Sequence, residues 1–324
     1  MTHLRRRLGF ATLAALLYAG LGYLMIWADP TPGAMPFVVG LVLLPMGLAA
    51  ITTALANPLG EGRIWKDIFR AWIVLCAAIA LSAVLFGEGA LCLAIASPVL
   101  LGFSALGAVL SHLMLRRLAP ATVSGVFCLM PFALLPLEPH FTWQASAGRV
   151  TTVIEIDAPP AEVWRHTVQI PQIDAGALPW TVSHNLLGLP QPIDARLAPG
   201  SGVRQLRWTR GIAFEEVITD WQQDRALAWT FRFDATSIPD EIDRHIQVES
   251  RYLHLEGGGY RLEPLGQGTR LTLTTDYVVT SPLNAYFKAW GDLMLNDFHH
   301  VVLSVIKERS EGAPTGRSGE RPKG

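Results

Sequence analysis

The chain has 324 residues, of which 50% are hydrophobic and 16% are charged, and its formal net charge is −1. Residues 1–138 hold 8 basic and 5 acidic side chains, against 18 basic and 22 acidic ones in residues 139–324. The near-neutral charge argues against a nucleic-acid partner. The uneven distribution excludes both a single soluble domain and a protein embedded entirely in a membrane.

Five apolar runs without Asp, Glu, Lys or Arg occupy the first part of the chain. A helix needs roughly 20 such residues to cross a bilayer core of about 30 Å, so we predict a five-span transmembrane region over residues 1–138. The absence of ionisable groups from the runs argues against a pump or channel. We expect His112, close to Arg116 and Arg117, to have a packing or interfacial role. The runs are residues 8–27, 34–56, 71–87, 90–115 and 119–137.

Basic residues are concentrated in alternate connections between these runs. They precede the first run, separate the second from the third, and separate the fourth from the fifth, whereas the connections around Asp29 and Glu88 contain no Lys or Arg. Positive loops stay in the cytoplasm. We therefore predict a multi-pass protein of the cell (inner) membrane with a cytoplasmic N-terminus and, after five crossings, an extracytoplasmic polar part. The segment 61–70 suits either a short helix on the leaflet surface or a polar loop.

The polar half follows a linker at residues 139–149 and begins with a strand at 150–157, where the hydrophobic period changes to two. Pro160 then starts a helix, because proline is tolerated in a first turn, and the proline-rich residues 170–200 are expected to be mostly irregular. A long amphipathic helix over 281–307 closes the domain 150–308, and the tail 309–324 is expected to be disordered. Between the helix that starts at Pro160 and the long helix over 281–307 we predict an antiparallel meander, with Gly257–Gly259 as a hairpin turn. Its strands are about 203–209, 212–221, 226–234, 248–255, 260–264 and 269–279.

This order of elements resembles the helix-grip fold of the SRPBCC superfamily, which includes START-like lipid carriers and polyketide cyclases. Residues 153–164, VIEIDAPPAEVW, closely resemble the start of that family, and residues 221–233 and 268–275 look like its middle and final strands. The likeness covers about residues 150–307. It is also similar to a bacterial subset in which such a domain follows several membrane spans; the residues we match to that subset are Arg204, Gly211, Phe214, Glu216, Trp221, Trp290, Asp292 and His299.

The resemblance implies a curved antiparallel sheet around the last helix, enclosing an apolar cavity for a lipid, sterol, polyketide or hormone-like ligand. It implies no common catalytic residue, because members range from carriers to cyclases and hydrolases. The predicted fold class is therefore a membrane α-helical N-terminal bundle followed by an α+β helix-grip domain.

Alternating apolar residues on the predicted strands and one face of the last helix provide the candidate pocket. The alternative is that these side chains only fill the core. The candidates are Arg204, Leu206, Trp208, Glu216, Trp229, Phe231, Tyr277, Trp290 and Met294, with Trp290 and Met294 expected to close the pocket over Trp229 and Phe231.

Arg204 and Glu216 are the most informative polar candidates. Each has the strand parity of apolar neighbours, and a tight connection near Arg210 and Gly211 would bring the two almost opposite one another. Three interpretations remain open: a structural ion pair, contact with a ligand head group, or exposure to solvent.

Asp292 and His299 are seven residues apart on the predicted last helix, which allows a polar relay with a cavity water. A structural or solvent-facing role is the alternative. His299 and His300 point about 100° apart and do not suit a shared metal. We predict no metal, no cofactor and no assigned catalytic residue.

Three functions remain open. The first is a membrane-anchored, non-catalytic carrier or sensor for a lipid or isoprenoid-like molecule, with the bilayer and an apolar small molecule as partners. The second is a cyclase-like or hydrolase-like enzyme that uses Asp292, His299 or Glu216 as acid or base. The third is a membrane scaffold that binds a protein. A carrier predicts a large dry pocket, an enzyme converging titratable groups, and a scaffold a filled interior.

Overall fold

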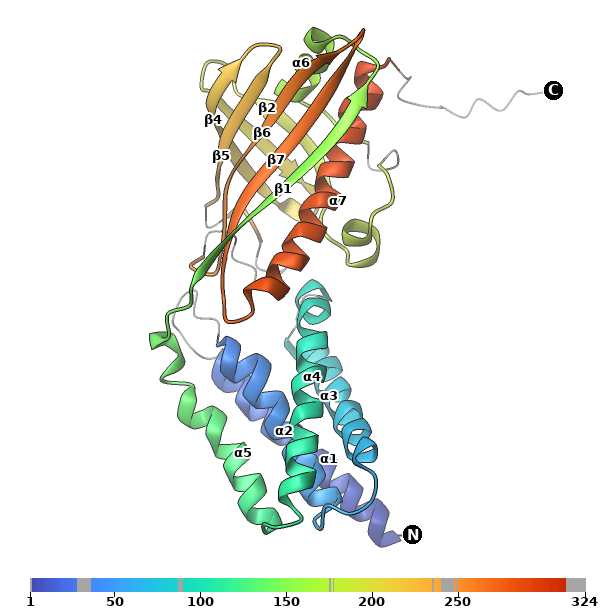
Figure 1. The fold of residues 1–324 in the computed structure, drawn as a ribbon, viewed down its shortest axis with the longest axis vertical. Coiled ribbons are helices and arrows are strands. Elements are labelled where there is room, and N and C mark those ends of the chain that lie inside the picture. The colour runs from blue at the N-terminus through green and yellow to red at the C-terminus, as the bar shows by residue number, and fades with distance from the viewer. Residues whose placement is uncertain are drawn as a thin grey trace, which may run out of the picture. The chain divides into compact units, whose positions relative to one another are not determined.

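The computed structural model describes residues 2–27, 36–86, 90–174, 176, 178–234, 236–239, 248 and 250–312. The chain divides into two compact units, Met1–Gln144 and Ala145–Gly324 (Figure 1). The connections around Asp29 and Glu88, and all but the first residues of the tail 309–324, lie outside the described residues.

The first unit is helical, with α2 packed against each of the other four α-helices. Small residues permit this close packing. A Cβ on Gly107 of α4 would lie 2.6 Å from the Met46 backbone, and one on Gly47 would lie 2.1 Å from the Tyr18 hydroxyl oxygen. The helices are α1 (Thr2–Trp27), α2 (Leu44–Ala56, preceded by the π-helix η1, Val38–Leu43), α3 (Ile64–Phe86), α4 (Ala90–Met114) and α5 (Pro120–Leu134).

Four helices in the described part of the chain are long and apolar enough to cross a membrane: Arg5–Ile26, Val38–Ala56, Ile64–Leu85 and Leu91–Met114. The fifth predicted span corresponds to α5, which has 15 residues. At 1.5 Å per residue this helix is about 22 Å long, shorter than a bilayer core of about 30 Å. Five crossings remain a prediction.

The connection between α2 and α3 is held by a buried polar cluster around Asp67. Residues 64–70 are the first turns of α3, rather than a separate surface helix or a polar loop. The Asp67 carboxylate accepts hydrogen bonds from Asn57 Nδ2 and Arg70 NH1, each at 2.8 Å. His112 Nδ1 lies 2.7 Å from Asp67 Oδ2, and Arg116 NH2 lies 3.2 Å from His112 Nε2. His112 therefore has a packing role, and its partner Asp67 lies between the second and third apolar runs.

The second unit is a seven-stranded antiparallel sheet in the order β1-β7-β6-β5-β4-β3-β2, with the long helix α7 (Asn284–Ser310) against β1 and β7 (Figure 1). This is the helix-grip architecture. The short helix α6 (Pro160–Val168) packs on α7, and a π-turn, η4 (Val182–Leu186), contacts the same helix. The strands are β1 (Ala145–Ile156), β2 (Pro192–Leu197), β3 (Val203–Trp208), β4 (Ala213–Gln222), β5 (Ala226–Arg232), β6 (Leu253–Leu265) and β7 (Gly268–Thr280).

Two strand predictions were wrong. Gly257–Gly259 lie inside β6, which continues from Leu253 to Leu265, so there is no hairpin turn. A Cβ on Gly257 would lie 2.6 Å from the Trp229 carbonyl oxygen, and one on Gly258 2.9 Å from the Trp229 ring. The glycines thus let β6 pass close to β5 and make space for the indole. The second error is that β2 was not predicted; it lies within the proline-rich stretch that was expected to be mostly irregular.

Candidate functional site

The candidate site is centred on an ion pair between neighbouring strands. Arg204 on β3 and Glu216 on β4 are directly paired in the register, which confirms the predicted juxtaposition. The connection η5 (Thr209–Gly211) turns tightly because Arg210 and Gly211 have φ values of 61° and 81°. Both paired side chains point into the domain, since Arg204 is 2% exposed and Glu216 3%. The solvent-exposed interpretation is therefore wrong.

The Arg204 guanidinium is held on several sides. Its Nε donates to Glu216 Oε2 at 2.5 Å, and NH2 contacts the same oxygen. NH1 donates to the Thr167 carbonyl oxygen at 2.5 Å. The guanidinium carbon lies 4.6 Å from the Trp229 ring centroid and 5.7 Å from that of Tyr260, within the range of cation–π attraction. Burial raises the pKa of the Glu216 carboxyl, and the charge and hydrogen bonds of Arg204 act in the opposite direction.

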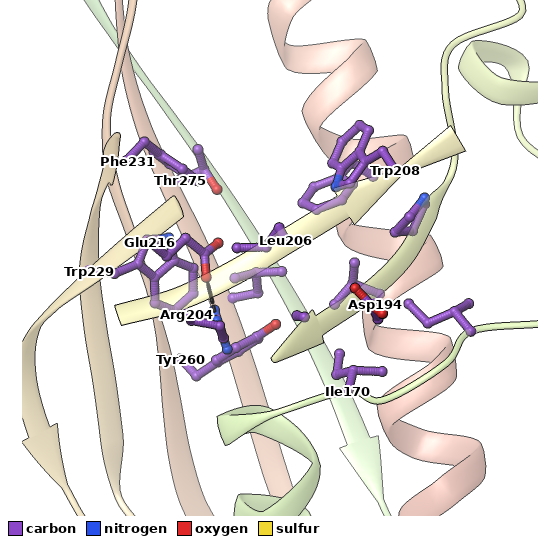
Figure 2. Close-up of a pocket in the computed structure, with 16 residues that line it drawn as sticks. Ile170, Asp194, Arg204, Leu206, Trp208, Glu216, Trp229, Phe231, Tyr260 and Thr275 are labelled. Carbon is purple, nitrogen blue, oxygen red and sulfur yellow. Dashed lines mark hydrogen bonds and ion pairs between the residues drawn. The ribbon is translucent and has the colours of Figure 1, made fainter. Parts of the chain in front are cut away.

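A small cavity of about 30 Å³ lies beside this pair, between the sheet and α7 (Figure 2). Its wall includes six of the nine predicted pocket residues: Arg204, Leu206, Trp208, Glu216, Trp229 and Phe231. Their part in ligand binding stays a prediction. The remaining wall is mostly apolar, with Ala195, Leu273, Phe298 and Val302 among its members.

Aromatic rings fill much of the space near the cavity. Trp208 stacks on Phe298 with 4.8 Å between ring centroids, and Phe214 stacks on Phe233 at 5.0 Å. Trp229 contacts Tyr260 at 5.2 Å. A cavity needs about 10–15 Å³ of this accessible volume to hold one water molecule, so this cavity accommodates a small group rather than a whole lipid.

The other three predicted pocket residues lie elsewhere. Tyr277 belongs to a separate cluster with Val150 and Val279, and the core around the cavity contains neither Trp290 nor Met294. Trp290 and Met294 do not line the cavity because they lie on a different side of α7 from the residues that face the sheet. Gly291 and Leu295 are the residues of α7 that face this part of the sheet, and Trp290 and Met294 precede them by one position, or about 100°. Phe298 and Val302 provide the helix wall instead.

Asp292 and His299 have separate hydrogen-bond partners in the structure, as in the structural alternative to a polar relay. Asp292 Oδ1 accepts a hydrogen bond from the Tyr277 hydroxyl at 2.6 Å. His299 is fully buried, with Nδ1 3.0 Å from Thr152 Oγ1 and Nε2 2.8 Å from Thr275 Oγ1. Burial lowers the pKa of His299 to about 4, so the imidazole is neutral near pH 7 and sits between two hydroxyl groups.

Several wall residues were missed from the sequence. Tyr260 and Thr275 line the cavity from β6 and β7, and Asp194 lines it from β2. Asp194 is 2% exposed and pairs with Arg207 and Arg196. The Arg207 hydrogen bond is the main reason that the pKa of Asp194 is lowered. The alternation of β7 already placed Thr275 on the same face as Leu271 and Leu273, but a threonine carries no signal of its own. Asp194 lay in a strand that was not predicted.

The residues that the structure describes include no group of three or more His, Cys, Asp or Glu side chains arranged to hold a metal ion. The polar groups at the cavity are the Arg204–Glu216 ion pair, the Asp194 carboxylate with its arginine partners, two indoles and hydroxyl groups. This arrangement suits hydrogen bonding to a ligand inside a largely apolar wall.

Comparison with known proteins supports a family for this domain. Residues 147–299 match the family described as polyketide cyclase / dehydrase and lipid transport. A search of curated proteins gave no match.

The solved structures that the search matched have low sequence identity and low TM-scores. The Aha1 dimer from Colwellia psychrerythraea is 15% identical, with 52% of this chain and 99% of that chain covered and a TM-score of 0.31. TTHA0849 from Thermus thermophilus is 17% identical, with 52% and 100% covered and a TM-score of 0.30. The di-domain ARO/CYC BexL from the BE-7585A biosynthetic pathway is 14% identical, with 66% of this chain and 64% of that chain covered and a TM-score of 0.33.

The family match spans most of the sheet and the first half of α7, including both members of the ion pair. The same residues build the antiparallel sheet wrapped round a long C-terminal helix. Residues 147–299 therefore form a domain of the polyketide cyclase / dehydrase and lipid transport family, within the SRPBCC superfamily, which follows a helical unit with four potential membrane spans.

Proposed function

We propose that this is an integral membrane protein whose C-terminal domain binds an apolar small molecule, of lipid or isoprenoid-like character, as a carrier or sensor. The observation that carries the proposal is the largely apolar cavity between the sheet and α7, in a domain whose family description includes lipid transport. The apolar helices support an attachment to the bilayer. Such tethering would raise the effective concentration of membrane-dissolved ligands at the domain.

On this proposal, a ligand enlarges the cavity when it binds. Pockets for drug-sized ligands measure about 300–1,000 Å³, and the cavity here is about 30 Å³. Trp208, Phe231 and Phe298 line it and are only half-buried. Rotation of these side chains is the step that admits the apolar part of the ligand.

A substitution that fills the cavity tests this proposal. Ala195→Val adds two carbons to a wall residue that is 7% exposed, and we expect it to weaken saturable binding of Nile red, a neutral apolar dye, by about tenfold or more. Overpacking would cost about 1 to 3 kcal/mol of stability. The measurement is a dye titration of the full chain in detergent. Ala213→Val, on the exposed side of β4, is the matched control. Equal binding by both variants, or no saturable binding by the wild type, would contradict the proposal and favour the scaffold.

Catalysis is the alternative for the same site. Burial raises the pKa of Glu216 at the cavity wall, and a perturbed carboxyl in a cavity is a feature of acid–base sites. Arg204 contacts this carboxylate directly, however, and Asp292 is engaged by Tyr277. The titratable groups proposed for an enzyme thus do not converge, which favours a carrier or sensor.

We further propose that the domain lies on the extracytoplasmic side, with the N-terminus in the cytoplasm. Arg116 and Arg117 precede α5, whereas no Lys or Arg follows it before Arg149. This asymmetry favours a crossing by α5 and adjoining residues. The short helix requires a thinned bilayer or non-helical flanking residues at the membrane surface.

Cysteine labelling tests this topology in a background without Cys76, Cys92 and Cys128. We expect Gln223→Cys, in the exposed turn after β4, to react with a membrane-impermeant maleimide in intact spheroplasts. Glu61→Cys, in the connection between α2 and α3, should react only after lysis, and it removes no basic residue. Labelling of Gln223→Cys only after lysis would show that α5 does not cross.

A further inference from the structure

Two buried donor atoms at the cavity lack a partner among the described residues, and a carboxylate lines the same cavity. Arg204 bonds to Glu216 through Oε2, which leaves Oε1 as an acceptor for a ligand. The indole Nε1 atoms of Trp208 and Trp229 are buried and donate to no described acceptor. Trp229 is 4% exposed, and both indoles line the cavity with Glu216. Buried groups without partners are costly, so this wall suits an occupant that can both donate and accept a hydrogen bond.

The cation at the site is already engaged. Arg204 directs Nε and NH2 to Glu216 and NH1 to the Thr167 carbonyl oxygen. Its face lies against the Trp229 ring. Figure 2 shows the second Glu216 oxygen turned away from Arg204. The groups at the wall that remain for a ligand are thus the acceptor Glu216 Oε1 and the indole N–H donors of Trp208 and Trp229. The positive charge of Arg204 is already paired.

These charges discriminate between head groups. A carboxylate or phosphate would bring a second negative charge to Glu216 in a site from which water is largely excluded, where like charges repel strongly. An ammonium group would meet Arg204 and would leave both indole N–H groups without an acceptor. A hydroxyl group donates one hydrogen bond and accepts others, and it is small enough for a cavity of about 30 Å³.

We propose that the cavity selects apolar ligands that end in a neutral hydroxyl group, which donates to Glu216 Oε1 and accepts from the Trp229 indole N–H. This inference rests on the proposed ligand-binding function. The hydroxyl head occupies the existing cavity, and the hydrocarbon part occupies the space made by the half-buried rings of Phe231 and Phe298. Long-chain and isoprenoid-type alcohols belong to the class selected; fatty acids and phospholipid head groups are rejected.

A competition between matched chains tests the selection. The full chain is mixed in detergent with equal amounts of 1-hexadecanol, hexadecanoic acid and 1-methoxyhexadecane, and the adducts are compared by native mass spectrometry. We expect the alcohol adduct to exceed each of the others by about tenfold, because each competitor leaves at least one buried polar group unpaired. The ether keeps the chain and an acceptor but cannot donate to Glu216.

Two variants connect the preference to this site. Trp229→Phe keeps an aromatic ring and removes one unpaired N–H from which the alcohol accepts, so the amount of alcohol adduct should fall severalfold. The ether accepts from the same N–H, so the excess of alcohol over ether should persist. Glu216→Gln removes the negative charge beside Arg204, so the acid adduct should rise relative to the alcohol. Glu215→Gln is the matched control, because Glu215 precedes Glu216 on β4 but forms an exposed pair with Arg232. It should leave the three adducts unchanged.

The outcomes separate this inference from the function on which it rests. Nile red binding together with an acid or ether adduct equal to that of the alcohol would overturn the hydroxyl selection alone. An alcohol adduct that Trp229→Phe leaves undiminished would also overturn it, even if Glu216→Gln fails to fold. Absence of all three adducts together with absence of saturable Nile red binding would overturn the proposed function itself.

Discussion

Arg204→Met is expected to lower the free energy of unfolding of the C-terminal domain by about 3 to 5 kcal/mol, because it leaves the Glu216 carboxylate buried without its charge partner. The double variant Arg204→Met with Glu216→Leu should recover much of that loss, since no charge then remains to be desolvated. Hydrogen exchange of β3 and β4 peptides in the full chain measures the change, because core strands open with free energies close to the global value.

An exposed ion pair on the same sheet provides the control. Arg232 and Glu215 pair across β5 and β4, and the Arg232 side chain is 57% exposed. Arg232→Met should therefore cost less than about 1 kcal/mol. If Arg204→Met and Arg232→Met had the same small effect, the buried pair would not stabilise the domain, and the assignment of Arg204 to the interior would be contradicted.

His299 should make the domain less stable in acid. Burial lowers its pKa from 6.5 to about 4, so between these values the unfolded chain binds a proton that the folded domain does not. The contribution of His299 to the free energy of unfolding is therefore at its maximum above about pH 6.5. It falls as the pH drops towards 4 and stays constant below that pH. A pKa difference of one unit corresponds to 1.36 kcal/mol, so the pKa shift of His299 lowers the free energy of unfolding by about 3 kcal/mol in acid.

The adjacent histidine makes the test specific. His299→Gln retains a side chain that can bond to Thr152 and Thr275 but cannot titrate, so the loss of stability between pH 6.5 and 4 should shrink. His300 is exposed and its side chain faces away from the sheet, so His300→Gln should retain the wild-type profile. Hydrogen exchange of β7 peptides, corrected for the intrinsic pH dependence of exchange, gives the profiles. Identical slopes for the two variants would show that His299 is not the group responsible.

The sequence by itself determined those features that depend on periodicity and local chemistry. Alternation along the predicted strands 203–209 and 212–221, with the turn at Arg210 and Gly211, was sufficient to place Arg204 opposite Glu216. Strand parity likewise indicated the sides of Leu206, Trp208, Trp229 and Phe231. Apolar runs long enough to cross a bilayer are visible without a structure, because length and composition alone decide that property.

Only the tertiary structure decided which groups meet across elements distant in the chain. Trp290 and Met294 were predicted to line the cavity, but they are about one residue out of phase with the face of α7 that packs on the sheet. Phe298 and Val302 line the cavity instead. Asp292 and His299 form hydrogen bonds with different residues of β7. A spacing of seven residues places them on one side of a helix but does not determine which strand residues they contact. Gly257–Gly259 are compatible with a turn on local grounds, but the proximity of β5 and the Trp229 indole favours a continuous strand. The size of the cavity was also invisible in the sequence, because it is the small remainder after large rings have packed.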